Sequence, residues 1–202
     1  MRPEEVLAML EDTGAVQRGH FRLSSGRHSD VYAQKFRVLE HPRLARDLGA
    51  AIAEEFEGGF DVVASPAVGA VILGFATALA ADARFVFTER VEGSMAFRRG
   101  FRVEPHDRVL VVEDVVTTGG SVREVVDLLR PLGAVVVGVG ALIDRTNPGS
   151  APDLGVPLRA LVRLEAASWE ERECPLCARQ QPFVDPGSSR MATSSSNPEK
   201  GS

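Results

Sequence analysis

The chain has 202 residues, of which 44% are hydrophobic and 25% are charged. This is the composition of an ordinary globular domain, and it excludes a mostly disordered chain and a fibrous repeat. The net charge is −5, with 28 acidic against 23 basic residues, which argues against a strongly basic nucleic-acid-binding protein.

The order of predicted elements indicates an α/β fold. Apolar spacing predicts helices over residues 3–12 and 42–57, and a hairpin over residues 20–36. From there strands and helices alternate: we expect strands over 60–64, 85–87, 108–112, 134–143 and 158–164, and helices ending near 81 and spanning 119–132. Continuous apolar strands that alternate with helices predict a Rossmann-like parallel sheet with helices on both faces.

The segments outside this alternation are assigned separately. Residues 1–40, with the last strand, are expected to form a small N-terminal hood over one end of the sheet, and residues 42–165 the core. Residues 89–107 are polar and rich in arginine and glycine, which predicts a loop. Residues 187–202 are rich in serine, glycine and proline, which predicts a disordered tail after a folded domain of residues 1–186.

One stretch is long enough to cross a membrane, because residues 62–81 carry no charge. It contains Ser65, Pro66, Gly69 and Gly74, and its β-branched first part is followed by small residues. A buried strand, a turn and a buried helix account for it better. With an acidic N-terminal segment and only two cysteines, we expect a cytoplasmic protein with no membrane partner.

The segment from Arg108 to Arg123 predicts a binding site for a phosphorylated sugar. Four apolar residues are followed by Glu113 and Asp114, and then by a loop of hydroxyl and glycine residues before a helix. Ligands of parallel sheets bind at the carboxyl ends of strands, and a helix N-terminus attracts anions. The loop is therefore a candidate phosphate site, and the two acids could accept hydrogen bonds from sugar hydroxyls or help to hold Mg²⁺.

This segment closely resembles the phosphoribosyl pyrophosphate (PRPP) signature of the type I phosphoribosyltransferases. It has no Gly-Lys-Ser/Thr and so differs from a Walker loop. Three further segments resemble the orotate phosphoribosyltransferases in particular: residues 21–29, the Pro-Ala turn at residues 65–69, and the Asp144–Arg145 pair. The resemblance runs from about residue 4 to residue 186.

The resemblance implies the reaction and its residues. Members of this family transfer ribose 5-phosphate from PRPP to orotate, giving orotidine 5′-monophosphate and pyrophosphate in pyrimidine biosynthesis. The residues that the resemblance places on PRPP are Glu113, Asp114, Val115, Val116, Thr117, Thr118, Gly119, Gly120, Ser121, Arg90, Arg98 and Arg99. Of these, Glu113, Asp114 and Arg90 are the candidate catalytic residues. Orotate is assigned to Thr117, Arg145, Ser25, Gly26 and Tyr32.

The resemblance also implies a cofactor and an assembly. Mg²⁺ would be bound mainly through the substrate, near Glu113 and Asp114, and the enzyme would be a homodimer with shared active sites, completed by a mobile loop at residues 89–107. Many relatives carry lysines in that loop, one lysine in the Pro-Ala turn and one before the Ser-Gly turn. This chain has arginines in the loop, Gly69 in the Pro-Ala turn and Ser24 before the Ser-Gly turn. Arginine can neutralise pyrophosphate but cannot protonate it near neutral pH.

Three alternatives stay open. The chain could be a phosphoribosyltransferase for another base, or a regulator that binds PRPP without turnover. Cys174 and Cys177, spaced as C-x-x-C, could be half of a four-cysteine zinc site completed across a dimer.

Overall fold

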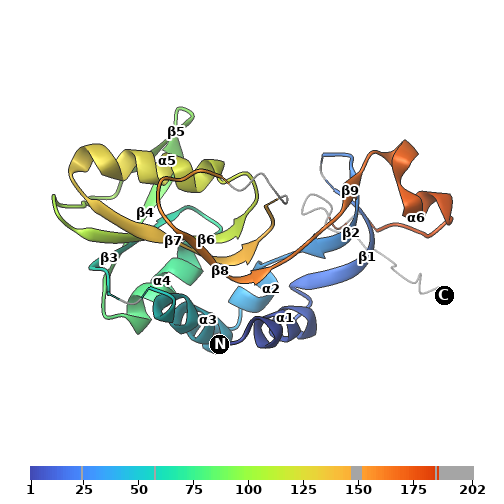
Figure 1. The fold of residues 1–202 in the computed structure, drawn as a ribbon, viewed down its shortest axis with the longest axis horizontal. Coiled ribbons are helices and arrows are strands. Elements are labelled where there is room, and N and C mark those ends of the chain that lie inside the picture. Colours follow the sequence, from blue (N-terminus) through green and yellow to red (C-terminus); the bar gives the residue numbers. More distant parts are fainter. Residues whose placement is uncertain (24, 57, 147–151, 185, 187–202) are drawn as a thin grey trace, which may run out of the picture. The chain divides into compact units, whose positions relative to one another are not determined.

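Six strands lie side by side in the computed structural model of this chain, which describes residues 1–23, 25–56, 58–146, 152–184 and 186 (Figure 1). In order across the sheet they are β5 (Ser94–Phe97), β4 (Arg84–Val91), β3 (Val62–Pro66), β6 (Arg108–Val116), β7 (Val135–Asp144) and β8 (Leu158–Arg163). Five neighbouring strands run parallel to one another: β4, β3, β6, β7 and β8. β5 pairs antiparallel with β4 at one edge of the sheet. The expected α/β fold with a parallel sheet is confirmed.

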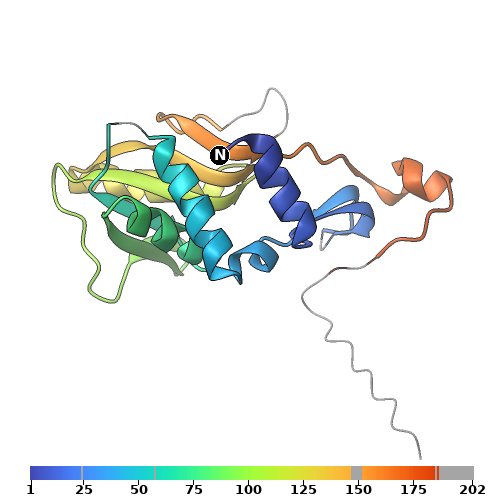
Figure 2. The same cartoon turned by 90° about the horizontal axis from the view of Figure 1, so that it is seen from below.

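Helices cover both faces of this sheet. α3 (Pro42–Glu54) and α4 (Val71–Ala80) pack together on one face, and α5 (Gly120–Leu129) lies on the other, followed by a short 3-10 turn, η1 (Arg130–Leu132) (Figures 1 and 2). Two further helices, α1 (Pro3–Asp12) and the short α2 (Phe36–Leu39), contact each other, and α1 also contacts β8. The sheet is therefore buried on both faces, which explains its continuous apolar strands.

The core between the sheet and α5 is built from β-branched and leucine side chains. Along β6, Val109 and Val111 face this core, where they meet Val122, Val126 and other buried residues of α5. Strand side chains alternate between the two faces, so the intervening residues of β6 point toward α3 and α4. This packing fixes β6 and the start of α5, the two elements that bracket the candidate site.

The chain divides into two compact units, and the division differs from the expected hood. The first unit is Met1–Gln17 with Ala33–Glu165; the second is Arg18–Tyr32 with Ala166–Ser202, as far as that range is described. Helix α1 and strand β8 therefore belong to the first unit, so the small unit has other bounds than the expected hood: of residues 1–40 it contains 18–32, and residues after 165 join it in place of the last strand. β8 pairs in parallel with β7, so it continues the main sheet.

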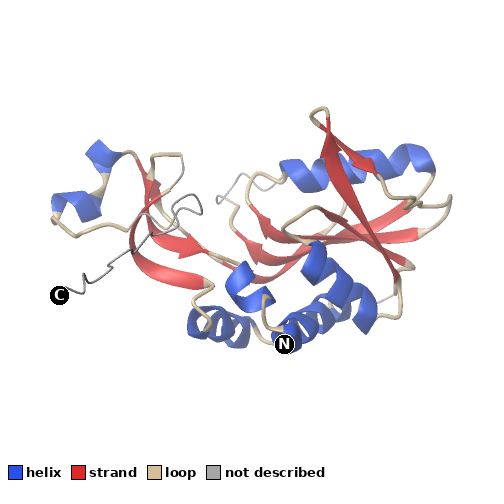
Figure 3. Cartoon of the chain, turned by 180° about the vertical axis from the view of Figure 1, so that it is seen from behind, coloured by secondary structure: helices blue, strands red, loops and turns tan. Residues whose placement is uncertain are grey.

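The second unit is a small three-stranded sheet with a C-terminal segment. Its strands are β1 (Val16–Arg22), which begins in the first unit, β2 (His28–Ala33) and β9 (Ser168–Trp169), in the order β1-β2-β9 (Figure 3). The segment continues through a 3-10 turn, η2 (Glu171–Glu173), and the short helix α6 (Pro175–Ala178). The expected hairpin is confirmed, but its pairing with residues from the far end of the chain was not predicted.

One further expectation is modified. Residues 89–97 are not irregular, because β4 runs on to Val91 and pairs with β5 to form a hairpin in which Arg90 lies opposite Met95. The predicted disordered tail at 187–202 lies outside the described residues. Among the described helices, none is long and apolar enough to cross a membrane.

Candidate functional site

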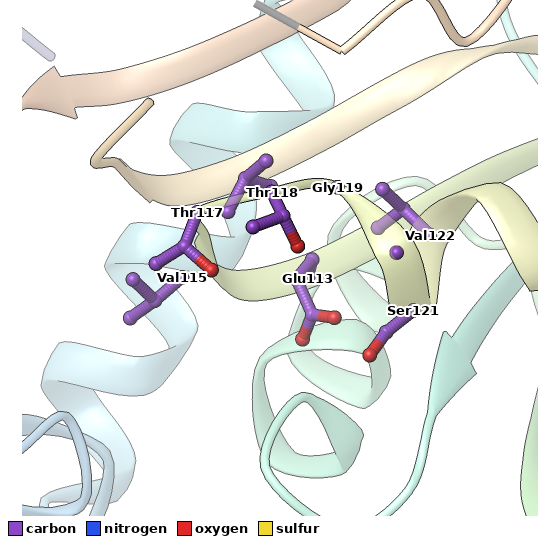
Figure 4. Close-up of a pocket in the computed structure, with 9 residues that line it drawn as sticks. Glu113, Val115, Thr117, Thr118, Gly119, Ser121 and Val122 are labelled. Carbon is purple, nitrogen blue, oxygen red and sulfur yellow. The ribbon is translucent and has the colours of Figure 1, made fainter. Parts of the chain in front are cut away.

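A pocket opens at the carboxyl end of β6, where the chain turns into α5. It is lined by one acid and the whole loop that follows it: Glu113, Val115, Val116, Thr117, Thr118, Gly119, Gly120, Ser121 and Val122. Its volume is about 60 Å³, room for a few water molecules or one small anion. Figure 4 shows the carboxyl group of Glu113 and the hydroxyl group of Ser121 on the same side of this loop.

The loop takes its shape from Gly119. This residue has a φ of +75°, a left-handed conformation that favours glycine. A Cβ at this position would also lie 2.6 Å from the side chain of Pro152, closer than any real contact. The left-handed turn at Gly119 carries the chain into α5, and the close approach of Pro152 leaves no room for a side chain at this position.

The start of α5 has the chemistry of an anion site. The first backbone N–H groups of a helix have no partner within the helix, and they carry the positive end of its dipole. Within the described residues, no side chain caps the N-terminus of α5. Thr117 and Thr118 are exposed and Ser121 is half-buried, so their hydroxyls add donors at the same place. A phosphate group fits this combination of donors.

Glu113 and Asp114 lie within β6, because the strand continues to Val116 rather than ending at residue 112 as expected. Both are buried, with 8% and 5% of their surface exposed. Glu113 Oε1 accepts a hydrogen bond from the backbone N–H of Asp114 at 3.0 Å. Burial, together with the charge of Asp114, raises the pKa of Glu113 to about 8. This shift favours the neutral, protonated form of Glu113 in the ligand-free protein.

The charge of Asp114 is balanced by a residue that the sequence analysis did not assign to the site. Lys35 Nζ lies 3.0 Å from Asp114 Oδ2, in an ion pair that is mostly shielded from solvent. When Glu113 is protonated, the opposite charges of Lys35 and Asp114 cancel, and this part of the site has no net charge. One feature of the sequence could have drawn attention to Lys35, because Lys35 and Lys200 are the only lysines among 23 basic residues.

The Pro-Ala turn after β3 passes directly over this ion pair. A Cβ on Gly69 would lie 2.2 Å from Asp114 Oδ2 and 3.3 Å from Lys35 Nζ. Only glycine allows so close an approach of backbone to carboxylate. The absence of a side chain at Gly69 leaves this space to the Lys35 ammonium.

The three candidate arginines are placed on or after the β4–β5 hairpin, and none of them lines the pocket as described. Arg90 Nη2 donates to Glu124 Oε1 of α5 at 2.9 Å, so its charge is held beside the helix that begins at the loop. Arg99 binds Glu89 through two hydrogen bonds of 2.9 and 3.0 Å, and Arg98 is exposed. Their contact with PRPP stays a prediction.

The residues assigned to orotate fall in both units. In the first, β6–β7 pairing places Asp144 beside Val116, and the backbone N–H of Arg145 donates to Val116 O at 2.8 Å, which brings Arg145 next to Thr117. Asp144 accepts a hydrogen bond from the backbone of Thr146 at 2.8 Å. The pairing of β6 with β7 thus puts Arg145 at the edge of the pocket loop.

Ser25, Gly26 and Tyr32 belong to the hairpin of the second unit. Gly26 has a φ of +81° in the tight turn between β1 and β2, and Ser25 is exposed there. The hydroxyl of Tyr32 donates to Pro186 O at 3.2 Å, and its ring lies 5.7 Å from that of Phe21. These contacts give Tyr32 a structural role within its unit, and its contact with orotate stays a prediction.

Comparison with known proteins gives a consistent result. The profile of the phosphoribosyl transferase domain matches residues 36–156. The chain is 47% identical to the orotate phosphoribosyltransferase of Pelotomaculum thermopropionicum and 44% identical to that of Caldanaerobacter subterraneus, in each case over 95% of this chain and 100% of the relative. It also resembles the crystal structure of Mycobacterium tuberculosis orotate phosphoribosyltransferase in complex with inorganic phosphate, with a TM-score of 0.64, 27% identity, and coverage of 80% of this chain and 95% of that one.

Proposed function

This chain belongs to the orotate phosphoribosyltransferases of the phosphoribosyl transferase family, and we propose that its reaction takes place at the loop between β6 and α5. The family reaction transfers ribose 5-phosphate from PRPP to orotate: the bond from ribose C1 to a pyrophosphate oxygen breaks, and a bond from C1 to N1 of orotate forms. The observation that carries the assignment of the site is the pocket in which Glu113, Thr117 and Ser121 surround the N-terminus of α5.

In the proposed mechanism the loop at residues 117–121 holds the 5′-phosphate and so fixes the ribose over β6. The ribose hydroxyls are then within reach of Glu113 and Asp114. As the pyrophosphate leaves, positive charge develops on the sugar, and the fixed negative charge of Asp114 stabilises it. Arg145 is placed beside the loop to bind the carboxylate of orotate, for which a planar guanidinium is well suited.

Magnesium fits this site only as an ion held mainly by the substrate. The two adjacent carboxyl groups offer the hard oxygen ligands that Mg²⁺ prefers, but Asp114 Oδ2 already pairs with Lys35, and the raised pKa of Glu113 favours its neutral form. Mg²⁺ commonly uses one or two carboxylates together with substrate phosphates. We therefore propose Glu113 and Asp114 as the protein side of its environment, where the ion would neutralise the charge of the pyrophosphate.

We propose that Arg90, like the magnesium ion, neutralises negative charge on the pyrophosphate. Replacing Arg90 by alanine is expected to lower kcat about tenfold and to weaken pyrophosphate binding, because a cation held beside α5 is lost. The control is Arg84→Ala, which removes a similarly exposed, ion-paired arginine at the other end of β4 and should leave kcat unchanged. Steady-state kinetics over a range of Mg²⁺ concentrations measures both. Unchanged kcat and pyrophosphate affinity in Arg90→Ala would remove Arg90 from the mechanism.

We also propose that the working enzyme is a homodimer. One face of α4 exposes three large apolar side chains at helical spacing, Ile72, Phe75 and Leu79, beside an exposed Val68. Contiguous exposed apolar surface of this kind marks protein interfaces. Light scattering is expected to give twice the chain mass of 21.7 kDa, and Phe75→Glu should shift it to the monomer. A monomer in the unmodified protein would contradict the proposal.

A further inference from the structure

The second unit gathers both cysteines of the chain and two of its four histidines at one point. His20 comes from β1 and His28 from β2, while Cys174 and Cys177 come from the segment around α6, more than 140 residues later. One ligand atom from each residue lies within 4.8 Å of all the others, and three of the four residues are buried. These are the side chains that bind zinc in proteins.

The distances between the four ligand atoms are close to those of a tetrahedral site. Cys174 Sγ lies 3.5 Å and Cys177 Sγ 3.7 Å from His20 Nε2, and Cys177 Sγ lies 3.2 Å from His28 Nδ1. With zinc–nitrogen and zinc–sulfur bonds of normal length, such edges measure about 3.3–3.8 Å. The two nitrogens are 2.8 Å apart, so a bound ion would separate them by about half an ångström.

The surroundings of His20 prepare it as a ligand. Its Nδ1 lies 2.7 Å from the backbone carbonyl of Gln181, and only a protonated Nδ1 can donate to a carbonyl. The lone pair is then on Nε2, the atom that faces the two sulfurs and His28. Metal-binding histidines characteristically donate their other N–H to a carbonyl or carboxylate in this way.

The rest of the unit offers little else to hold it together. Its fully buried apolar side chains within the described residues are Phe21, Val31 and Cys174. Phe183 covers the cluster, with its ring 5.5 Å from that of His20 and 5.3 Å from that of His28. Units with so small an apolar core generally need a disulfide or a metal to be stable, and both cysteines are free thiols.

We propose that one zinc ion is bound within a single chain by four side chains: His20, His28, Cys174 and Cys177. Two thiolates and two imidazoles complete a tetrahedron, so the site is closed and structural rather than catalytic. It links the C-terminal segment to the β1–β2 hairpin. One alternative left open by the sequence was a four-cysteine site completed across a dimer; the structure places two histidines of the same chain beside the C-x-x-C pair instead.

The test is the metal content of the full-length protein purified under reducing conditions. Plasma mass spectrometry is expected to find about one zinc per chain, and Cys174→Ser, Cys177→Ser and His28→Ala should each lower this at least fivefold. The matched controls are His41→Ala and His106→Ala, which remove the two exposed histidines outside the cluster and should leave the zinc content unchanged.

A second measurement covers variants that fail to fold. The unmodified protein, loaded with cobalt(II) in place of zinc, is expected to show the intense thiolate-to-cobalt absorption of a tetrahedral site. That absorption should be absent after both cysteines have been alkylated. Removing the metal should also make the segment after residue 166 sensitive to protease while the main sheet keeps its circular dichroism. Less than about 0.1 zinc per chain, a Cys174–Cys177 disulfide in the reduced protein, or a zinc content that the cluster variants do not change would each overturn the proposal.

Discussion

Replacing Asp114 by asparagine is expected to lower kcat about a hundredfold while the fold is retained. Asp114 is buried at the end of β6 and is held in place by Lys35 at 3.0 Å. Asparagine removes one unit of negative charge and leaves the Lys35 ammonium unpaired, so this part of the site gains a net positive charge. A change of one unit charge at about 5 Å, with an effective dielectric constant of about 20, disfavours the developing positive charge of the sugar by about 3 kcal/mol. A penalty of this size corresponds to roughly a hundredfold in rate.

The measurement is the steady-state rate of orotidine monophosphate formation at saturating PRPP and orotate. Asp127→Asn is the matched control, because Asp127 is an exposed residue of α5 whose ion pair with Arg130 lies on the surface. It should retain activity within about twofold, since exposed ion pairs contribute little. If Asp114→Asn were as active as Asp127→Asn, the fixed charge at residue 114 would have no part in the reaction.

The stability of the ligand-free protein is expected to fall as the pH rises from about 5 to 8, and Glu113 is the cause. Its pKa is raised from 4.5 to about 8 by burial and by Asp114. Between these values the folded chain holds a proton that the unfolded chain releases, so raising the pH favours unfolding. The loss amounts to on the order of 3 kcal/mol, and it levels off above the folded pKa.

Chemical denaturation at a series of pH values tests this, with Glu113→Gln as the variant. The glutamine cannot ionise, so the variant should be the more stable protein near pH 8, although its activity is lost. The control is Glu89→Gln. The hydrogen bond from Arg99 lowers the pKa of Glu89, so Glu89 is not a cause of the loss of stability above pH 5. The Glu89→Gln variant should therefore lose stability with rising pH as the wild type does. Parallel stability curves for wild type and Glu113→Gln would show that Glu113 is already ionised at neutral pH.

The parts of the fold and site that could be predicted are those encoded in neighbouring residues. The apolar run before Glu113 and the glycines after Thr118 specify a buried strand, a glycine-containing loop and a helix within sixteen residues. Because turn chemistry and hydrophobic period are local properties, the positions of β6 and α5 followed directly. The parallel sheet followed in the same way from the alternation of strands and helices.

The features that were missed depend on contacts between distant parts of the chain. Gly69 fits against the Asp114 carboxylate because β3 and β6 are neighbours in the sheet, and Lys35 reaches the same carboxylate from the start of α2. The second unit joins residues 18–32 to residues beyond 165, so the two histidines of its hairpin meet the C-x-x-C pair. Neither the period of the apolar residues nor the composition shows that these two distant segments lie together. The scarcity of lysine was the one signal in the sequence that marked Lys35.

The proposed reaction and its site are tested together by pyrophosphate release from PRPP and Mg²⁺ by the purified protein, with orotate, uracil, hypoxanthine and adenine offered separately. We expect release with orotate alone, matched mole for mole by orotidine monophosphate, and a loss of that release in Asp114→Asn. Release with one of the other bases, or tight PRPP binding without release for any base, would contradict the proposed reaction.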